Sequence, residues 1–101
     1  MVGGAVGGIG MAMTEETLID HRYGRYINAN FVDYHVPVHA DAPPMDVLFV
    51  NKADMIISPT GAKGIGEIAL VGVAPAIINA IYNATGKRVR RLPVTPDQLI
   101  G

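Results

Sequence analysis

The chain has 101 residues, which limits it to one domain with a modest core. Half of its residues are hydrophobic, 17% are charged and the formal net charge is −1, so it has no general field that would attract nucleic acid or an anionic membrane. It contains no cysteine, which excludes disulfide scaffolds, cysteine-based zinc sites and cysteine nucleophiles. Such an apolar composition in so small a chain predicts a surface that a larger assembly covers.

The first element expected along the chain is a glycine-rich helix. Gly7–Glu16 (GGIGMAMTEE) gains regularity toward its methionines, which predicts a helix over this range. Gly3, Gly7 and Gly10 recur at roughly helical spacing, and a face without side chains lets another backbone approach closely. We therefore expect this helix to pack through those three glycines.

The next segments carry strand-like patterns. Thr17–Ile27 has apolar residues on both sides of a polar turn, which predicts a hairpin with Gly24 in its turn. Phe31–His39 alternates and is rich in Val and Tyr, so we expect a strand that ends near Pro37. Val47–Val50 is wholly apolar and is predicted to be a short strand buried on both faces.

The second half of the chain predicts helices. We expect Glu67–Val71 to begin a helical turn or two, and Pro75 to open a second helix, Pro75–Ala84, because proline loses nothing in a first turn. Gly86 is a suitable residue to end that helix. Val89–Val94 is predicted as a short strand or extended exit, and Pro96–Ile100 as a final turn. The expected class is α+β.

Two uncharged stretches could suggest a leader or a membrane span. Met1–Thr14 lacks a basic start and is rich in glycine, which does not suit a signal peptide. Ile68–Gly86 approaches the roughly 20 apolar residues of a span, but Gly, Pro, Asn and Thr interrupt it, so a buried helix is expected. The cytoplasm is the default compartment under this interpretation.

Glu67 is the residue with the clearest chemical potential. It follows a loop that contains Gly61, Gly64 and Gly66, which allow positive φ and a close approach of a ligand to the backbone. The ordinary interpretation is a carboxylate placed favourably at a helix start. The functional alternative is a glutamate enclosed by apolar residues that acts as a general base.

Weaker patterns have ordinary explanations. The glycines in Gly64–Ala69 imitate a dinucleotide fingerprint but follow no convincing strand. His35, His39 and Asp41 could suggest a metal site, although surface histidines beside a proline explain them better. The basic run Lys87–Arg91 is expected to be a solvated edge or a contact to an acidic partner rather than a nucleic-acid site.

Several short motifs follow one another in a specific order. They are Gly3–Glu16 (GGAVGGIGMAMTEE), Asn28–Tyr34 (NANFVDY), Gly61–Glu67 (GAKGIGE), Val73–Ile77 (VAPAI) and Leu92–Pro96 (LPVTP). With these motifs the chain resembles, over practically all its residues, the C-terminal part of the molybdenum-binding subunit of the xanthine dehydrogenase/aldehyde oxidase family. The GAKGIGE element is the most specific of them.

The resemblance implies a chemistry. Enzymes of this family hydroxylate aldehydes or N-heterocycles with water as the oxygen donor, at a molybdenum held by molybdopterin, in bacteria often as the cytosine dinucleotide. Their base is a glutamate that removes a proton from the attacking oxygen, and it maps onto Glu67. Lys63, Gly64, Ile65 and Gly66 map to the loop that borders the metal and the pterin. No residue of this chain is expected to ligate the metal.

The resemblance also implies partners. Electrons leave through iron–sulfur and flavin subunits or domains, while the substrate pocket and the other pterin loops belong to the remainder of the molybdenum subunit. We therefore expect residues 1–101 to be a single C-terminal fragment that is inactive alone and can self-associate into a homo-oligomer, with neither nucleic acid nor a membrane span.

The chain departs from the family pattern at two glutamines. One would immediately precede the residue that matches Met1, and the other, sometimes found in the helix, is Gly7 here. The alternative to an enzyme fragment is a non-catalytic structural or dimerisation module with the same fold. The substrate does not follow from these residues.

Overall fold

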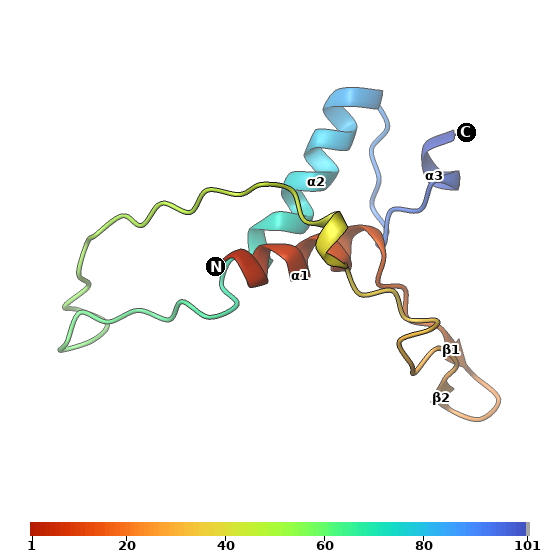
Figure 1. The fold of residues 1–101 in the computed structure, drawn as a ribbon, viewed down its shortest axis with the longest axis horizontal. Helices are drawn as coiled ribbons and strands as arrows, with labels where there is room; N and C mark the ends of the chain where they lie inside the picture. The colour runs from red at the N-terminus through yellow and green to blue at the C-terminus, as the bar shows by residue number, and fades with distance from the viewer. Residues whose placement is uncertain (101) are drawn as a thin grey trace.

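The computed structural model describes residues 1–100 and has an α+β fold, as predicted (Figure 1). Two helices, α1 and α2, pack against each other, and a small hairpin and a long loop extend away from them in different directions. The elements, in chain order, are α1 (Val2–Met13), β1 (Ile19–Asp20), β2 (Arg25–Tyr26), the 3-10 helix η1 (His39–Asp41), α2 (Leu70–Thr85) and α3 (Asp97–Ile100).

Helix α1 begins earlier than the sequence predicts. The expected range was Gly7–Glu16, whereas the helix occupies Val2–Met13 and buries only small residues, namely Gly4, Gly8, Gly10 and Ala12. Glycine disfavours a helix in isolation. Packing against α2 compensates for this low propensity, since tertiary contacts supply most of the stability of helices in proteins.

The hairpin forms where it was predicted. Ile19 pairs with Tyr26 and Asp20 with Arg25 in an antiparallel register. Gly24 lies in the turn with φ of 62°, and its N–H donates to the carbonyl of Asp20 at 2.8 Å. The positive φ explains why glycine occupies this position.

Asn28 fastens the base of the hairpin. Its Oδ1 accepts a hydrogen bond from the N–H of Leu18 at 3.0 Å, and its Nδ2 donates to the carbonyl of Glu16 at 2.6 Å. The side chain is only 5% exposed. Both ends of this buried amide are therefore satisfied, as buried polar groups require.

The strand predicted over Phe31–His39 is absent, and a turn takes its place. Asn30 Oδ1 accepts hydrogen bonds from the N–H groups of Val32 and Asp33 at 2.9 and 3.1 Å. An asparagine that bonds the backbone two and three residues ahead offers an alternative to a strand ladder. Phe31 is consequently 89% exposed, with no sheet to pack against.

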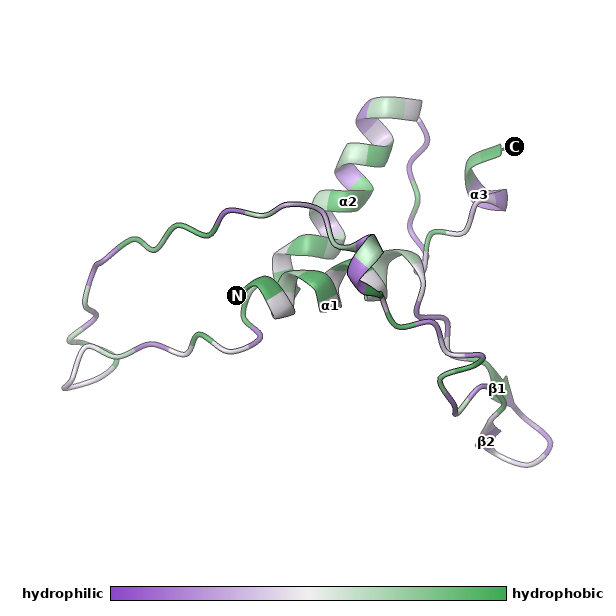
Figure 2. Ribbon diagram, in the orientation of Figure 1, coloured by the Kyte–Doolittle hydropathy of each residue, from purple (hydrophilic) through white to green (hydrophobic). Residues whose placement is uncertain are grey.

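The predicted buried strand Val47–Val50 is also absent. It lies in the long loop between η1 and α2, where Leu48 and Val50 are each 91% exposed. Figure 2 shows hydrophobic stretches along this loop, well away from the helices. The prediction was wrong because the described residues provide neither a partner strand nor a covering layer.

Helix α2 is one continuous helix rather than the predicted pair. It runs through Pro75, which lacks the N–H that would reach the carbonyl of Val71. Both residues are exposed, so water can take the place of the missing bond. Gly86 ends the helix at φ of 72° with its N–H on the carbonyl of Tyr82, as predicted. Neither α2 nor any other helix among residues 1–100 is sufficiently long and apolar to cross a membrane.

Part of the basic run serves the fold. The Arg88 guanidinium lies 3.7 Å from the ring centroid of Tyr82, and its Nη1 donates to Asn79 Oδ1 at 3.0 Å. Lys87 Nζ donates to the carbonyl of Leu99 at 2.7 Å. These contacts hold the segment after α2 close to the helix and to α3.

The described residues bury little. Val89–Val94 forms no strand and bends at residues 91–93, and the N–H of Val94 donates to the carbonyl of Ala12 at 2.7 Å. The accessible surface is 7989 Å² and the radius of gyration 17.2 Å. A compact protein of 10.7 kDa exposes roughly 5,500 Å² and has a radius of gyration of about 13 Å. The fold is therefore open, which agrees with a surface that other protein covers.

Candidate functional site

Glu67 lies just before α2. The helix begins at Leu70, whose N–H donates to the carbonyl of Glu67 at 2.9 Å. The expectation that Glu67 itself starts the helix was therefore off by three residues. Helix α2 has no acidic residue in its first turn and no side-chain N-cap, so Glu67 is the carboxylate nearest in sequence to its positive end.

The side chain of Glu67 faces open space. It is exposed rather than enclosed by apolar residues, which contradicts the expected apolar surroundings. Among residues 1–100 it makes no hydrogen bond or ion pair. Its carboxylate is consequently available to another molecule or to another part of a larger protein.

The backbone of Glu67, by contrast, is closely packed against α1. A Cβ added at Gly4 would lie 3.3 Å from the Cα of Glu67 and 3.4 Å from its carbonyl carbon and oxygen. Distances this short leave no room for a side chain unless the backbone of Glu67 moves. Gly4 therefore permits the close approach that places the backbone of Glu67 beside the N-terminal end of α1.

A second glycine of α1 fixes the first turn of α2. A Cβ at Gly8 would lie 2.6 Å from the Cβ of Val73 and 3.1 Å from the carbonyl oxygen of Leu70. A Cβ at Gly3 would meet nothing within 4 Å, and one at Gly7 would meet only the end of the Leu70 side chain at 3.4 Å. The face that packs against α2 thus runs through Gly4 and Gly8, not through the predicted Gly3 and Gly7.

The third predicted glycine packs elsewhere. A Cβ at Gly10 would collide with Glu15 Oε1 and lie 2.7 Å from the Cδ of Pro37. Gly10 therefore permits a close contact, as expected. The segment that packs against it is the one before η1, however, and not a second helix.

The loop before Glu67 is tightly folded only at its start. Gly61 has φ of 69°, and a Cβ there would lie 2.9 Å from the Cβ of Ala53. Gly64 and Gly66 do not adopt the positive φ that glycine allows, and a Cβ at either would meet nothing within 4 Å. Lys63 is exposed. The part of this loop next to Glu67, residues 63–66, therefore has free space around it.

The loop offers hydrogen-bond donors. Within residues 1–100, the N–H groups of residues 62–66 make no hydrogen bond, and Lys63 adds an ammonium group. Such donors suit anionic or carbonyl oxygen atoms of a ligand. In the described part of the chain no three His, Cys, Asp or Glu side chains gather as a possible metal site, so the structure does not bring His35, His39 and Asp41 together as one.

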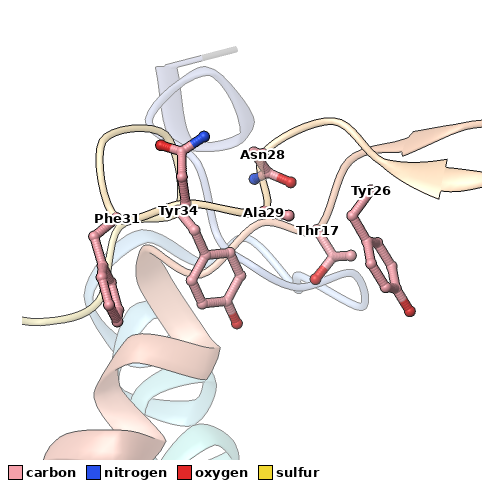
Figure 3. Close-up of a pocket in the computed structure, with 7 residues that line it drawn as sticks. Thr17, Tyr26, Asn28, Ala29, Phe31 and Tyr34 are labelled. Carbon is pink, nitrogen blue, oxygen red and sulfur yellow. The ribbon is translucent and has the colours of Figure 1, made fainter.

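A separate pocket lies at the base of the hairpin (Figure 3). It measures about 370 Å³ and is lined by Thr17, Tyr26, Asn28, Ala29, Asn30, Phe31 and Tyr34. Tyr34 donates a hydrogen bond from its hydroxyl to Glu15 Oε2 at 2.7 Å, which raises the pKa of Tyr34 above 10.0. Sequence analysis missed this pair, because Glu15 and Tyr34 are far apart in the chain.

The pocket and Glu67 lie at opposite ends of α1. Gly4, which contacts Glu67, is near the start of the helix, whereas Glu15 follows its end. A helix of this length spans about 18 Å. The pocket is therefore not part of a site built around Glu67.

The chain is similar in sequence to molybdenum-binding proteins. Residues 1–43 match the molybdopterin cofactor-binding domain family. The chain is 48% identical over 100 residues to the aldehyde oxidoreductase molybdenum-binding subunit PaoC of Escherichia coli, covering 99% of this chain and 14% of that subunit. It is 40% identical over 97 residues to a xanthine dehydrogenase molybdenum-binding subunit of Escherichia coli, covering 96% of this chain and 13% of that one.

A solved structure shares the fold. The crystal structure of quinoline 2-oxidoreductase from Pseudomonas putida superposes with a TM-score of 0.80 at 25% identity, over 96% of this chain and 12% of that chain. The open arrangement of helices, hairpin and long loop is therefore found inside a much larger protein.

By sequence and by fold, this chain is a relative of part of a molybdopterin-dependent oxidoreductase subunit. More particularly, it resembles the molybdenum-binding subunits of the xanthine dehydrogenase/aldehyde oxidase family. The chain spans no more than 14% of the length of these relatives. The domain match ends at residue 43, so it contains the close-packed glycines of α1 but not Glu67.

Proposed function

We propose that this chain is the C-terminal segment of a molybdenum hydroxylase subunit and that Glu67 is its general base. The observation that carries the proposal is a glutamate whose backbone is packed against α1 while its side chain stays exposed beside an open loop. A general base needs a positioned side chain with access to the reacting proton, and here the packed backbone sets where that side chain begins. The proposed substrates are aldehydes or N-heterocycles.

The residues before Glu67 fit an anionic organic cofactor. The proposed ligands are the N–H groups of Lys63, Gly64, Ile65 and Gly66 together with the Lys63 ammonium, because donors of this kind suit oxygen atoms of a pterin or its phosphate. When bound, molybdopterin with molybdenum, as the cytosine dinucleotide in our proposal, supplies the redox chemistry. The described residues offer no cluster that would ligate the metal directly.

Glu67 has one proposed task in this chemistry. Its carboxylate would accept a proton from the water-derived oxygen as that oxygen attacks the substrate carbon, so negative charge on Glu67 is neutralised while the new carbon–oxygen bond forms. The substrate carbon–hydrogen bond breaks in the same step, and its hydrogen and two electrons would pass to the redox chemistry that the bound cofactor supplies. Gly64 and Gly66, which have free space around them, let the cofactor lie close to the loop.

The same proposal assigns the partners. The exposed loop around Leu48 and the open shape suit a segment that the remainder of the molybdenum subunit covers, with iron–sulfur and flavin subunits or domains to remove electrons. We propose that the isolated chain is inactive. The competing function is a structural module without catalysis, which the exposed apolar surface also permits.

The test compares two substitutions in the complete molybdenum subunit. Glu67→Gln preserves size and removes the base, so kcat should fall roughly 10²–10⁴-fold with the molybdenum content unchanged. Lys63→Ala should lower molybdenum content more than it lowers kcat per molybdenum. Full activity of a molybdenum-loaded Glu67→Gln enzyme would reject the general base, and a subunit that holds no molybdenum at all would favour the structural module.

A further inference from the structure

We infer that Gly4 is a positioning residue for Glu67. This inference rests on the proposed role of Glu67 as the base, and it concerns how the fold sets the place of that carboxylate. A Cβ at Gly4 would lie 3.3 Å from the Cα of Glu67 and 3.4 Å from its carbonyl carbon. Gly4 is buried, so the contact is part of the packed interface between α1 and the start of α2.

The contact acts on the part of Glu67 that determines where its side chain starts. The Cα of Glu67 is the atom nearest to the added methyl group, and its carbonyl accepts the N–H of Leu70 at 2.9 Å. Since no other described residue holds the Glu67 side chain, the backbone alone sets its origin. Displacing this backbone by a few tenths of an ångström displaces the point from which the carboxylate must reach the reacting proton.

Catalysis is sensitive to such displacement, because a misplacement of about 1 Å can cost about 10²-fold in rate. Gly4→Ala adds one methyl group and forces a smaller shift than this. We therefore expect kcat of the complete molybdenum subunit to fall on the order of tenfold with KM and molybdenum content retained. A loss of fold or cofactor, by contrast, would lower molybdenum content in proportion to activity.

The chain supplies a matched control on the same helix. A Cβ at Gly3 would meet nothing within 4 Å. Gly3→Ala therefore makes the same chemical change one residue away and should leave kcat within about twofold of the wild type, because it removes no contact and adds no clash.

A double-mutant cycle decides whether Gly4 acts through Glu67. If it does, Gly4→Ala should lower kcat in the wild type but have no further effect in a Glu67→Gln background, since contacting residues are not additive. An equal fall in both backgrounds would overturn the inference, and so would a Gly4→Ala enzyme as active as Gly3→Ala. Full activity of Glu67→Gln alone would instead reject the proposed base, which is a different result.

Hydrogen exchange of the 101-residue chain gives a readout without cofactor or turnover. Gly4→Ala should speed exchange of the Leu70 amide, which bonds the Glu67 carbonyl, relative to amides in the middle of α2. Gly3→Ala should not. If Gly4→Ala prevents cofactor loading, this measurement still decides: unchanged exchange at Leu70 overturns the inference, and selectively faster exchange supports it.

Discussion

Gly8 of α1 and Val73 of α2 are so close that a methyl group on Gly8 would lie 2.6 Å from the Cβ of Val73. No side-chain rotation moves the Cβ of Val73, since it is bonded to the backbone, and the branched side chain beyond it has few alternative rotamers. The two helices can therefore keep their distance only while residue 8 has no side chain. This contact sets the first turn of α2, and with it the region in which Glu67 lies.

The packing of these helices predicts opposite effects for two substitutions. Gly8→Ala should destabilise the chain by about 1–3 kcal/mol, because overpacking outweighs the gain of about 0.5–1 kcal/mol from replacing a helical glycine. Gly3→Ala meets no atom within 4 Å and should keep that gain. Urea unfolding of both variants measures the difference. Equal stability of the two variants would contradict the packing described.

Asn28 should be essential to the hairpin. Asn28→Ala removes the partners of the Leu18 N–H and the Glu16 carbonyl, so the free energy of unfolding should fall by about 1–3 kcal/mol. Thermal unfolding, with the exposed Asn83→Ala as the control, checks this expectation. A loss no larger than that of the control would show that water satisfies both backbone groups.

The Tyr34–Glu15 hydrogen bond predicts a pH dependence. It raises the pKa of Tyr34 above 10.0, with smaller contributions in the same direction from burial and the Glu15 charge. Because the pKa is raised in the folded state, the stability from this contact is fully present below pH 10.0 and is lost as pH rises through the folded pKa.

A spectrophotometric titration can measure this shift. The difference between the wild type and Tyr34→Phe should show one phenol that ionises above pH 10.0, and Glu15→Gln should lower its pKa by removing the charge. A Tyr34 phenol that titrates at or below the ordinary value would show that the hydrogen bond does not form.

The long loop should make the isolated chain associate. Leu48 and Val50 are each 91% exposed, and exposed apolar patches promote association. Changing both to Lys should reduce dye binding to apolar surface and favour the monomer in sedimentation. The control adds two Lys at the exposed Asn51 and Thr60 of the same loop. If both pairs of Lys substitutions reduced dye binding and association equally, the added charge and not the lost apolar surface would be the cause.

The sequence predicted the features of the fold that depend on the backbone conformation of a single residue. Gly24 and Gly86 adopt positive φ at the hairpin turn and at the end of α2. The residues around each glycine had predicted both positions. Pro75 was expected to begin a helix but lies inside one, because an exposed helix face tolerates the missing bond. Helix propensity alone does not distinguish a proline that begins a helix from one that lies inside an exposed helix.

Two other features depend on contacts that the sequence does not reveal. Glycines 3 and 7, like glycines 4 and 8, are four residues apart, so helical spacing could not tell which pair faces α2. The apolar pattern of Val47–Val50 predicted a buried strand, but burial requires a neighbour outside the described residues. The sequence predicted that Glu67 lies close to the start of a helix, but neither its place three residues before α2 nor its exposure followed from the sequence.

The central claim is that Glu67 takes the proton in the chemical step. The most direct measurement is the single-turnover rate of substrate oxidation in the complete molybdenum subunit with Glu67→Gln, normalised to bound molybdenum. We expect this rate to fall roughly 10²–10⁴-fold, because a positioned general base contributes that much, while substrate binding and molybdenum content stay near those of the wild type. A rate within about twofold of the wild type would contradict the claim, since a carboxylate that only faces a helix dipole contributes about 0.3–1 kcal/mol to stability.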